Sequence, residues 1–419
     1  MPVWKVCGGK RLEGALEVQG SKNAVLPILA ASLLSGGVTR LSNCPELLDV
    51  SASADILRHL GCGVMQNGGE ILVDSSRMTE NHIPHALMER MRSSVMYLGA
   101  ILARCGEVRL SAPGGCELGA RPIDLHLKAL EEMGAEVRQS GGEVLCRANG
   151  LHGAHINLAF PSVGATENVM LAACAAEGET VLTNAAREPE IVDLAGYLNA
   201  AGAQVSGAGT SQLRIAGRMP DRAFTEYRVM ADRIAACTFL CAVACAGGAL
   251  RLGGVVPAHF ATVTEALREL GCALVTGEDS VSIRVDAPLH AGKPLVTRPY
   301  PGFPTDAQAL LMSACLKARG TSVFVENIFE NRYRHVPELR RLGAQIQVEG
   351  RVAMVTGVER LSAAPVTATD LRGGAALILA ALGAEGETGV ADSGHIMRGY
   401  AGLDSALRSL GASISVEDA

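Results

Sequence analysis

The sequence predicts an α/β protein with internal pseudo-symmetry, divided into two domains, and three observations lead to that class. The chain has 419 residues, more than one hydrophobic core usually serves. Hydrophobic residues make up 48% of it but aromatic residues only 3%, and there are 48 glycines. The interior must therefore be built from small aliphatic side chains in short, turn-rich strands and helices. The third observation is an internal repeat.

The repeat is an amphipathic helical stretch that ends in Leu-x-x-(Leu, Met or Ala)-Gly-(Ala or Cys) and leads into an alternating strand pattern. Its six glycines are Gly61, Gly134, Gly202, Gly271, Gly343 and Gly411. Glycine at the end of a helix predicts a left-handed cap, which glycine adopts at little cost. The even spacing, about 70 residues, predicts six equivalent units. Six units divide naturally into two domains of three, with an active site expected in the cleft between them.

Composition excludes several classes of function. The formal net charge is −6, and no run of Lys and Arg is interleaved with aromatic residues, so we expect no nucleic-acid partner. The longest apolar stretch, residues 235–250, is interrupted and short, so we expect no membrane partner and a cytoplasmic protein. The 12 cysteines form no CxxC pair, which predicts buried thiols and no metal. Three of them, Cys237, Cys241 and Cys245, recur every four residues on an apolar segment.

Five short motifs contain chemically informative side chains. They are Ser21-Lys22-Asn23-Ala24, Pro113-Gly-Gly-Cys116 continuing to Gly119-Ala-Arg121-Pro122-Ile123-Asp124-Leu125-His126, Phe303-Pro-Thr-Asp306, Asp370-Leu-Arg372, and His395-Ile-Met-Arg398-Gly-Tyr400. A cysteine in a glycine-rich loop near an arginine is in a setting that stabilises the thiolate. An ordinary loop cysteine is the alternative, and the adjacent Glu117 leaves the resting protonation of Cys116 open.

Together these motifs resemble the enolpyruvyl transferases, and the Gly-Gly-Cys loop resembles the branch of that family that acts on UDP-N-acetylglucosamine. The resemblance covers the whole chain and implies an inside-out α/β barrel fold built from six βαβαββ-type units. It implies one domain from residues 22–230 and a second from 1–21 and 231–419. It also implies transfer of the enolpyruvyl group of phosphoenolpyruvate to the 3′-hydroxyl of UDP-N-acetylglucosamine with release of phosphate, the first committed step of peptidoglycan synthesis. No metal or organic cofactor is expected.

The resemblance assigns catalytic roles as well. Cys116 is expected to be the acid toward the methylene carbon and the site of a covalent adduct derived from phosphoenolpyruvate. Asp306 is expected to be the base, with Asp370 sharing the proton work, although a helix-capping role for Asp306 is the alternative. A positive cluster is expected to hold the carboxylate and phosphate of phosphoenolpyruvate. Its members are Lys22, Arg92, Arg121, Arg372 and Arg398.

The UDP-sugar is expected at a predicted helix N-terminus formed by Ser162, Val163 and Gly164, where backbone amides favour a diphosphate; a plain helix cap is the alternative. The remaining expected contacts are Asn23, Arg121, Pro122, Ile123, Asp124, Leu125 and Ile328. Phe160-Pro161 stand where some relatives carry a lysine, so one diphosphate contact is expected to be absent or supplied elsewhere.

A second departure concerns Ala231-Asp232-Arg233-Ile234-Ala235-Ala236-Cys237-Thr238, where the family commonly reads Pro-Asp-Arg-Ile-Glu-x-Gly-Thr. This segment is expected where the chain crosses between domains. It leaves open the alternative of a non-catalytic or weakly active UDP-sugar-binding paralogue. The sister reaction on shikimate 3-phosphate is a separate alternative. We expect a monomer or a weak homo-oligomer.

Overall fold

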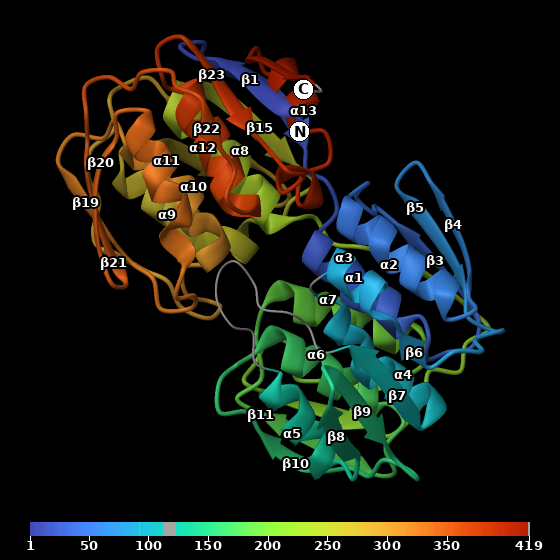
Figure 1. Ribbon diagram of the computed structural model, residues 1–419. Helices are drawn as coiled ribbons and strands as arrows, with labels where there is room; N and C mark the ends of the chain where they lie inside the picture. The colour runs from blue at the N-terminus through green and yellow to red at the C-terminus, as the bar shows by residue number, and fades with distance from the viewer. Residues whose placement is uncertain (92, 112–122, 418–419) are drawn as a thin grey trace. The chain divides into compact units, whose positions relative to one another are not determined.

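The structure is a computed structural model that describes residues 1–91, 93–111 and 123–417. Arg92, Cys116, Arg121 and Pro122, all named above as candidate site residues, therefore lie outside the described residues. The chain forms two compact units, shown in Figure 1. Among the described residues, unit 1 consists of residues 1–19 and 231–417, and unit 2 of residues 20–91, 93–111 and 123–230.

The described residues form six four-stranded sheets, three in each unit, and all six share one strand pattern. In each sheet one edge strand pairs parallel with its neighbour, and the other two pairings are antiparallel. The sheets of unit 1 are β2(Leu12–Glu17)-β15(Gly248–Gly253)-β17(Val281–Val285)-β16(Ala273–Thr276), β18(Leu295–Val296)-β19(Thr321–Val325)-β21(Val352–Thr356)-β20(Gln345–Glu349) and β22(Val366–Thr367)-β23(Glu387–Ala391)-β1(Val3–Cys7)-β24(Ser413–Glu417). Those of unit 2 are β14(Phe224–Arg228)-β3(Val38–Ser42)-β5(Glu70–Asp74)-β4(Gly63–Asn67), β6(His82–Ile83)-β7(Glu107–Ser111)-β9(Glu143–Arg147)-β8(Glu136–Ser140) and β10(His155–Asn157)-β11(Glu179–Thr183)-β13(Gln212–Ala216)-β12(Gln204–Ser206).

Each unit has inner helices that are almost wholly buried and outer helices with one exposed face. The inner helices are α8(Arg233–Ala246), α10(Thr305–Cys315) and α12(Leu371–Leu382) in unit 1, and α1(Lys22–Ala31), α4(Tyr97–Cys105) and α6(Val163–Ala173) in unit 2. The outer helices are α9(Ala261–Glu269), α11(Val336–Arg341), α13(Leu403–Ser409), α2(Leu48–His59), α5(Asp124–Glu132) and α7(Pro189–Ala200). Shorter elements are α3(His85–Arg90), η1(Ser94–Met96), η2(Pro257–Phe260), η3(Arg332–His335) and η4(Ile396–Arg398).

In unit 1 the helices α8, α10 and α12 pack against one another, and the sheets lie outside them (Figure 1). Helices inside and strands outside is the arrangement that the predicted inside-out barrel requires, so the predicted fold class is confirmed. Small residues make this packing possible. Ala, Gly, Ser and Cys occupy about half of the positions of α8, α10 and α12, which lets the backbones approach closely.

The six repeat glycines end the six outer helices in the same way. All six have positive φ, between 91° and 109°. In each case the glycine N–H bonds the carbonyl three residues back, and the next N–H bonds the carbonyl five residues back, as in Gly134 to Glu131 (2.9 Å) and Ala135 to Leu130 (3.0 Å). This is the Schellman arrangement, and the buried Ala or Cys after the glycine and the buried Leu at the start of the motif complete its apolar contact.

Among the described residues, no helix is both long enough and apolar enough to cross a bilayer. The described cysteines are all free thiols, and most of them are buried.

Candidate functional site

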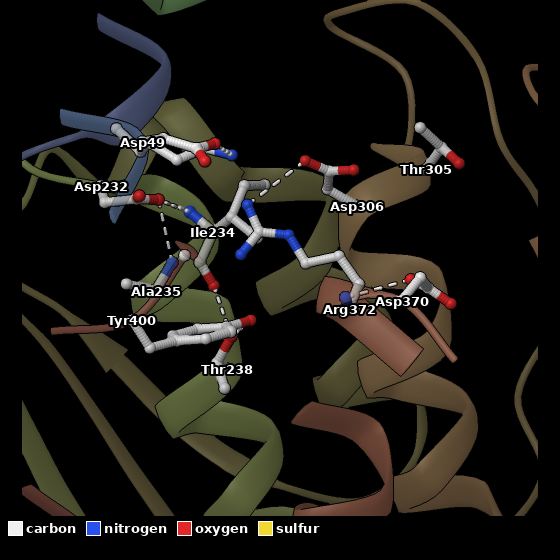
Figure 2. A network of polar contacts seen from close by, with 12 residues as sticks. Asp49, Asp232, Ile234, Ala235, Thr238, Thr305, Asp306, Asp370, Arg372 and Tyr400 are labelled. Carbon is white, nitrogen blue, oxygen red and sulfur yellow. Dashed lines mark hydrogen bonds and ion pairs between the residues drawn. The ribbon is translucent and has the colours of Figure 1, made fainter. Parts of the chain in front are cut away.

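Asp306 lies in the first turn of α10 and faces two arginines. The residue before the helix is Pro304, whose side chain forms no capping hydrogen bond, so Asp306 lies within the first turn and not at the N-cap position. Arg332 donates from Nη2 to Oδ1 of Asp306 at 3.2 Å. Arg372 donates from Nη2 to Oδ2 at 3.3 Å (Figure 2). Both arginines are nearly buried, at 2% and 4% exposure, whereas the Asp306 side chain is 30% exposed. The carboxylate therefore stays accessible while it is held on both oxygens.

Arg372 is held in turn by an aromatic ring. Its guanidinium lies 5.3 Å from the ring centroid of Tyr400, whose hydroxyl is 2.9 Å from Oγ1 of Thr238 on α8 (Figure 2). Burial alone would lower the pKa of the Arg372 guanidinium, but the nearby Tyr400, Asp306 and Asp232 raise it above its usual range. Arg372 is thus a fixed positive charge, and its Nη1 has no hydrogen-bond partner among the described residues.

Asp370 caps helix α12. Its Oδ1 accepts from the backbone N–H of Arg372 at 3.1 Å and of Gly373 at 3.0 Å, and Arg332 lies 3.9 Å away. The cap sets where α12 begins and so where the Arg372 side chain leaves the helix. His335, wholly buried beside this group, has its pKa lowered by burial, an effect that Asp370 partly offsets.

Other site residues predicted in unit 1 lie on short connections. Arg398 ends η4 and is half-buried. The start of η4 is fixed by Asp392, which accepts from the backbone N–H of His395 (2.7 Å) and of Ile396 (3.1 Å). Ile328 lies in the turn after β19, and its N–H donates to Glu326 at 2.8 Å.

In unit 2, Lys22 and Asn23 are the first two residues of α1, and both are half-buried. Lys22 donates to Oδ2 of Asp49 at 3.3 Å, and Asp49 is only 2% exposed. Asp49 thereby holds the ammonium at the start of the helix, a position where the helix dipole favours an anion over a cation.

The predicted diphosphate site is the N-terminus of α6. Ser162 is its N-cap, and Oγ of Ser162 accepts from the N–H of Ala165 at 3.3 Å, so the capping role is present. His126 of α5 packs beside Gly164, and its Nδ1 is 2.8 Å from Nδ2 of Asn168. Burial lowers the pKa of His126 to about 4, so this histidine is neutral. Asp124 is the first residue of α5, which Ile123 precedes as N-cap.

The structure brings Asp306, Asp370 and Arg372 into one contact network in unit 1, but it also contains members that the sequence did not predict. Arg332 is the most important of them, because nothing in its local sequence marks it as buried. Asp232 is another, since it caps α8 by accepting from the N–H of Ile234 (2.8 Å) and Ala235 (3.0 Å). An Asp just before an apolar run is a signal that identifies Asp232 and Asp370 as helix caps.

Among the described residues, no group of three or more His, Cys, Asp or Glu side chains could hold a metal ion.

Comparison with known proteins gives the class. The family model described as "EPSP synthase (3-phosphoshikimate 1-carboxyvinyltransferase)" matches residues 6–407. The chain belongs to this family of carboxyvinyltransferases, which are enzymes.

Curated relatives narrow the class further. The chain is 48% identical over 416 residues to UDP-N-acetylglucosamine 1-carboxyvinyltransferase 2 of Caldanaerobacter subterraneus subsp. tengcongensis, with 99% of both chains covered. It is 48% identical to UDP-N-acetylglucosamine 1-carboxyvinyltransferase of Zymomonas mobilis subsp. mobilis, with 98% of both covered.

Solved structures support the fold. The enolpyruvyl transferase NikO from Streptomyces tendae matches with a TM-score of 0.89 and 27% identity, over 100% of this chain and 99% of that one. EPSP synthase from Acinetobacter baumannii matches with a TM-score of 0.72 and 18% identity, over 100% of both chains.

Proposed function

We propose that this chain transfers the enolpyruvyl group of phosphoenolpyruvate to the 3′-hydroxyl of UDP-N-acetylglucosamine, as the names of its relatives indicate, in the first committed step of peptidoglycan synthesis. The observation that carries the proposal is Asp306, an accessible carboxylate held by two buried guanidinium groups in a chain 48% identical to such enzymes over 99% of its length.

The chemistry is an addition followed by an elimination. Asp306 removes the proton from the 3′-hydroxyl, and the oxygen forms a bond to the central carbon of phosphoenolpyruvate while a proton is added to the methylene carbon. The methyl carbon formed in this addition then loses a proton, the double bond re-forms, and inorganic phosphate leaves the central carbon. Buried cations such as Arg372 stabilise the negative charge that moves onto phosphate.

The roles of the other predicted residues belong to this proposal. Cys116 supplies the proton to the methylene carbon, as its motif implies. Its thiolate can also add to the central carbon while the double-bond electrons take up a proton at the methylene carbon, which gives the covalent adduct. The carboxylate and phosphate of phosphoenolpyruvate are bound by the positive side chains, namely Lys22, Arg92, Arg121, Arg372 and Arg398. The sugar nucleotide is bound by Asn23, Arg121, Pro122, Ile123, Asp124, Leu125, Ser162, Val163, Gly164, Asp306, Ile328 and Asp370.

The test is release of inorganic phosphate from phosphoenolpyruvate by the full-length protein. We expect release only when UDP-N-acetylglucosamine is present, and none with shikimate 3-phosphate. Release with shikimate 3-phosphate alone would favour the sister reaction. Binding of UDP-N-acetylglucosamine without any phosphate release would identify a non-catalytic paralogue and overturn the proposal.

A further inference from the structure

Glu326 is a buried carboxylate, 1% exposed, that follows β19. Its Oε1 accepts from the hydroxyl of Thr297 (3.0 Å) and from the backbone N–H of Ile328 (2.8 Å) and Phe329 (3.1 Å). Its Oε2 accepts from the hydroxyl of Thr305 at 3.0 Å. No Lys, Arg or His in the described part of the chain forms an ion pair with it. All four neighbours donate, which is the pattern that a buried carboxylate requires to offset its loss of water.

These four bonds join three separate segments. Thr297 follows β18, the amides belong to the turn at residues 327–329, and Thr305 is the first residue of α10. Thr297 is itself held in the same network, because its Oγ1 accepts from the N–H of Asn327 at 2.9 Å. Removing the Glu326 carboxylate would therefore leave two backbone amides and the Thr305 hydroxyl without their acceptor, and it would leave the Thr297 hydroxyl only the carbonyl of Val325 at 3.5 Å.

Two of the joined segments carry residues of the proposed site. Thr305 precedes Asp306 directly, and Ile328 is a proposed contact of the sugar nucleotide. Arg332 holds the same dipeptide from another direction, because its Nη2 donates to the carbonyl of Thr305 (3.0 Å) and to Oδ1 of Asp306 (3.2 Å). Thr305 is thus fixed through its hydroxyl by Glu326 and through its carbonyl by Arg332.

We propose that Glu326 is a positioning residue for the sugar-nucleotide reaction: its carboxylate fixes the start of α10, and with it Asp306, relative to the turn that carries Ile328. The proposal rests on the proposed function, because that function makes Asp306 and Ile328 partners of the sugar nucleotide. Glu326 itself touches neither substrate in this account. It acts through Thr305 and through the two turn amides.

The contacts of Glu326 form two arms: one to Thr305 at the start of α10, and one to Thr297 and the turn amides of Ile328 and Phe329. Mutation can separate the two arms. In Glu326→Gln, the side-chain oxygen can still accept hydrogen bonds from the turn amides. The side-chain N–H₂ group then faces Thr305, whose hydroxyl can rotate to accept a hydrogen bond from it. Glu326→Ala removes both arms. Thr305→Val removes only the arm to α10, whereas Thr305→Ser keeps its hydroxyl. A matched control is Asp193→Asn in unit 2, since Asp193 is another carboxylate that accepts from a hydroxyl, of Tyr227 (2.9 Å), and from a backbone amide, of Met230 (3.2 Å).

The first measurement is steady-state kinetics on variants whose folding is confirmed by cooperative denaturant unfolding. We expect Thr305→Val and Glu326→Ala to lower kcat/KM for UDP-N-acetylglucosamine about tenfold or more, since a misplaced catalytic group is costly. Glu326→Gln, which can keep both sets of contacts, should lower it by less. The KM for phosphoenolpyruvate should change by less than about twofold. Thr305→Ser should restore activity, and Asp193→Asn should leave it unchanged. An equal loss toward both substrates, or a Thr305→Ser variant as impaired as Thr305→Val, would overturn the proposal.

The second measurement does not depend on activity and so separates failure of this inference from failure of the proposed function. Hydrogen exchange of the free protein should accelerate at the amides of Ile328 and Phe329 in Glu326→Ala, by tenfold or more, and stay near the wild-type rate in Thr305→Val. Unchanged exchange in Glu326→Ala would overturn the positioning role even if the wild-type protein is fully active. Another outcome is a wild-type protein that is inactive while exchange still accelerates in Glu326→Ala. That combination would leave the positioning role standing and overturn only its assignment to the sugar-nucleotide reaction.

Discussion

At the scale of single residues, Asp306 combines two properties that usually exclude each other. It is accessible enough to meet a substrate, yet each of its oxygens is bonded to a buried guanidinium group. Two such partners fix the direction of the carboxylate, which is what a base must have at the moment of proton transfer.

Replacing Asp306 by Asn tests this arrangement. The amide keeps the size and part of the hydrogen bonding but cannot take up a proton, so turnover should fall by two or more decades, roughly the share of general base catalysis. Binding of UDP-N-acetylglucosamine should persist within a few-fold. Steady-state kinetics together with calorimetric binding measure both. If Asp306→Asn kept wild-type turnover, Asp306 would not be the base, and only a structural role at the start of α10 would remain.

The residue scale also shows where sequence reasoning stops. Short motifs predicted Asp306, Asp370 and Arg372, and the structure places these three side chains in one network. Arg332 and Glu326 were missed because a burial pattern for charged side chains is not visible in the local sequence. Their side-chain partners, Thr297 and Thr305 for Glu326 and Asp306 for Arg332, lie more than 20 residues away in the chain, and only the tertiary fold brings them together.

At the scale of secondary-structure elements, the repeat glycines were predictable because one physical constraint recurs six times. Each outer helix must stop and reverse within two residues, and a left-handed glycine does this at the least cost. The segment at residues 231–238, where the sequence predicts a crossing between domains, follows Met230, the last residue of unit 2. It forms the first turns of the buried helix α8, which Asp232 caps. Ala235 and Cys237 are both wholly buried in that helix.

Gly343 isolates the cost of the left-handed cap. Its φ is +91°, and a Cβ added there would meet no atom within 4 Å, so a substitution introduces backbone strain without a clash. Gly343→Ala should lower the free energy of unfolding by about 1–2 kcal/mol. Gly343→Asn should cost less, because asparagine tolerates the left-handed region better. Denaturant unfolding at fixed pH gives both values, and an alanine variant as stable as wild type would show that the cap is not needed to end α11.

At the scale of the whole molecule, acid should weaken the fold through buried histidines. The pKa of His335 is lowered by burial from its ordinary value of 6.5, so the folded state binds this proton less readily than the unfolded state. The stability that the fold retains while His335 is neutral is therefore fully present above pH 6.5 and is lost as the pH falls toward the lowered pKa. His126 in unit 2 acts in the same direction, but there the raised pKa of Asp193, about 6 through burial, opposes it.

His335→Gln separates this effect from other acid effects. Between pH 7.5 and pH 5.0 the wild-type protein should lose up to about 2 kcal/mol more stability than the variant, at roughly 1.4 kcal/mol per pH unit below 6.5. The variant is expected to be less stable at pH 7.5, because Nδ1 of His335 lies 3.2 Å from the carbonyl of Arg332, and so the difference between the two pH values is the relevant quantity. Denaturant midpoints of both proteins at the two pH values provide it. Equal pH dependence would mean that His335 takes up its proton without disturbing the fold.

Thiol reactivity provides a test that covers the whole chain, because cysteines are spread over both units. Burial raises the pKa of Cys44, Cys62, Cys146, Cys174, Cys237 and Cys272 to about 12 and that of Cys315 to about 11, so these thiols should be inert. Cys105 is exposed and is the natural internal control.

A small neutral alkylating agent should therefore modify Cys105 along with Cys116, whereas an epoxide bearing a phosphonate, such as fosfomycin, should modify Cys116 alone. The phosphonate would occupy the positive cluster proposed for phosphoenolpyruvate and bring the strained ring to the sulfur, an orientation effect that Cys105 lacks. UDP-N-acetylglucosamine should accelerate this labelling if it orders the groups around Cys116. Cys116→Ser should abolish it, and Cys116→Asp, which retains a proton donor without a soft nucleophile, should resist the reagent while keeping part of the turnover. Mass spectrometry of the digested protein identifies the labelled residue. Label found mainly on Cys105, or a Cys116→Ser variant that the epoxide still inactivates, would remove Cys116 from the proposed chemistry.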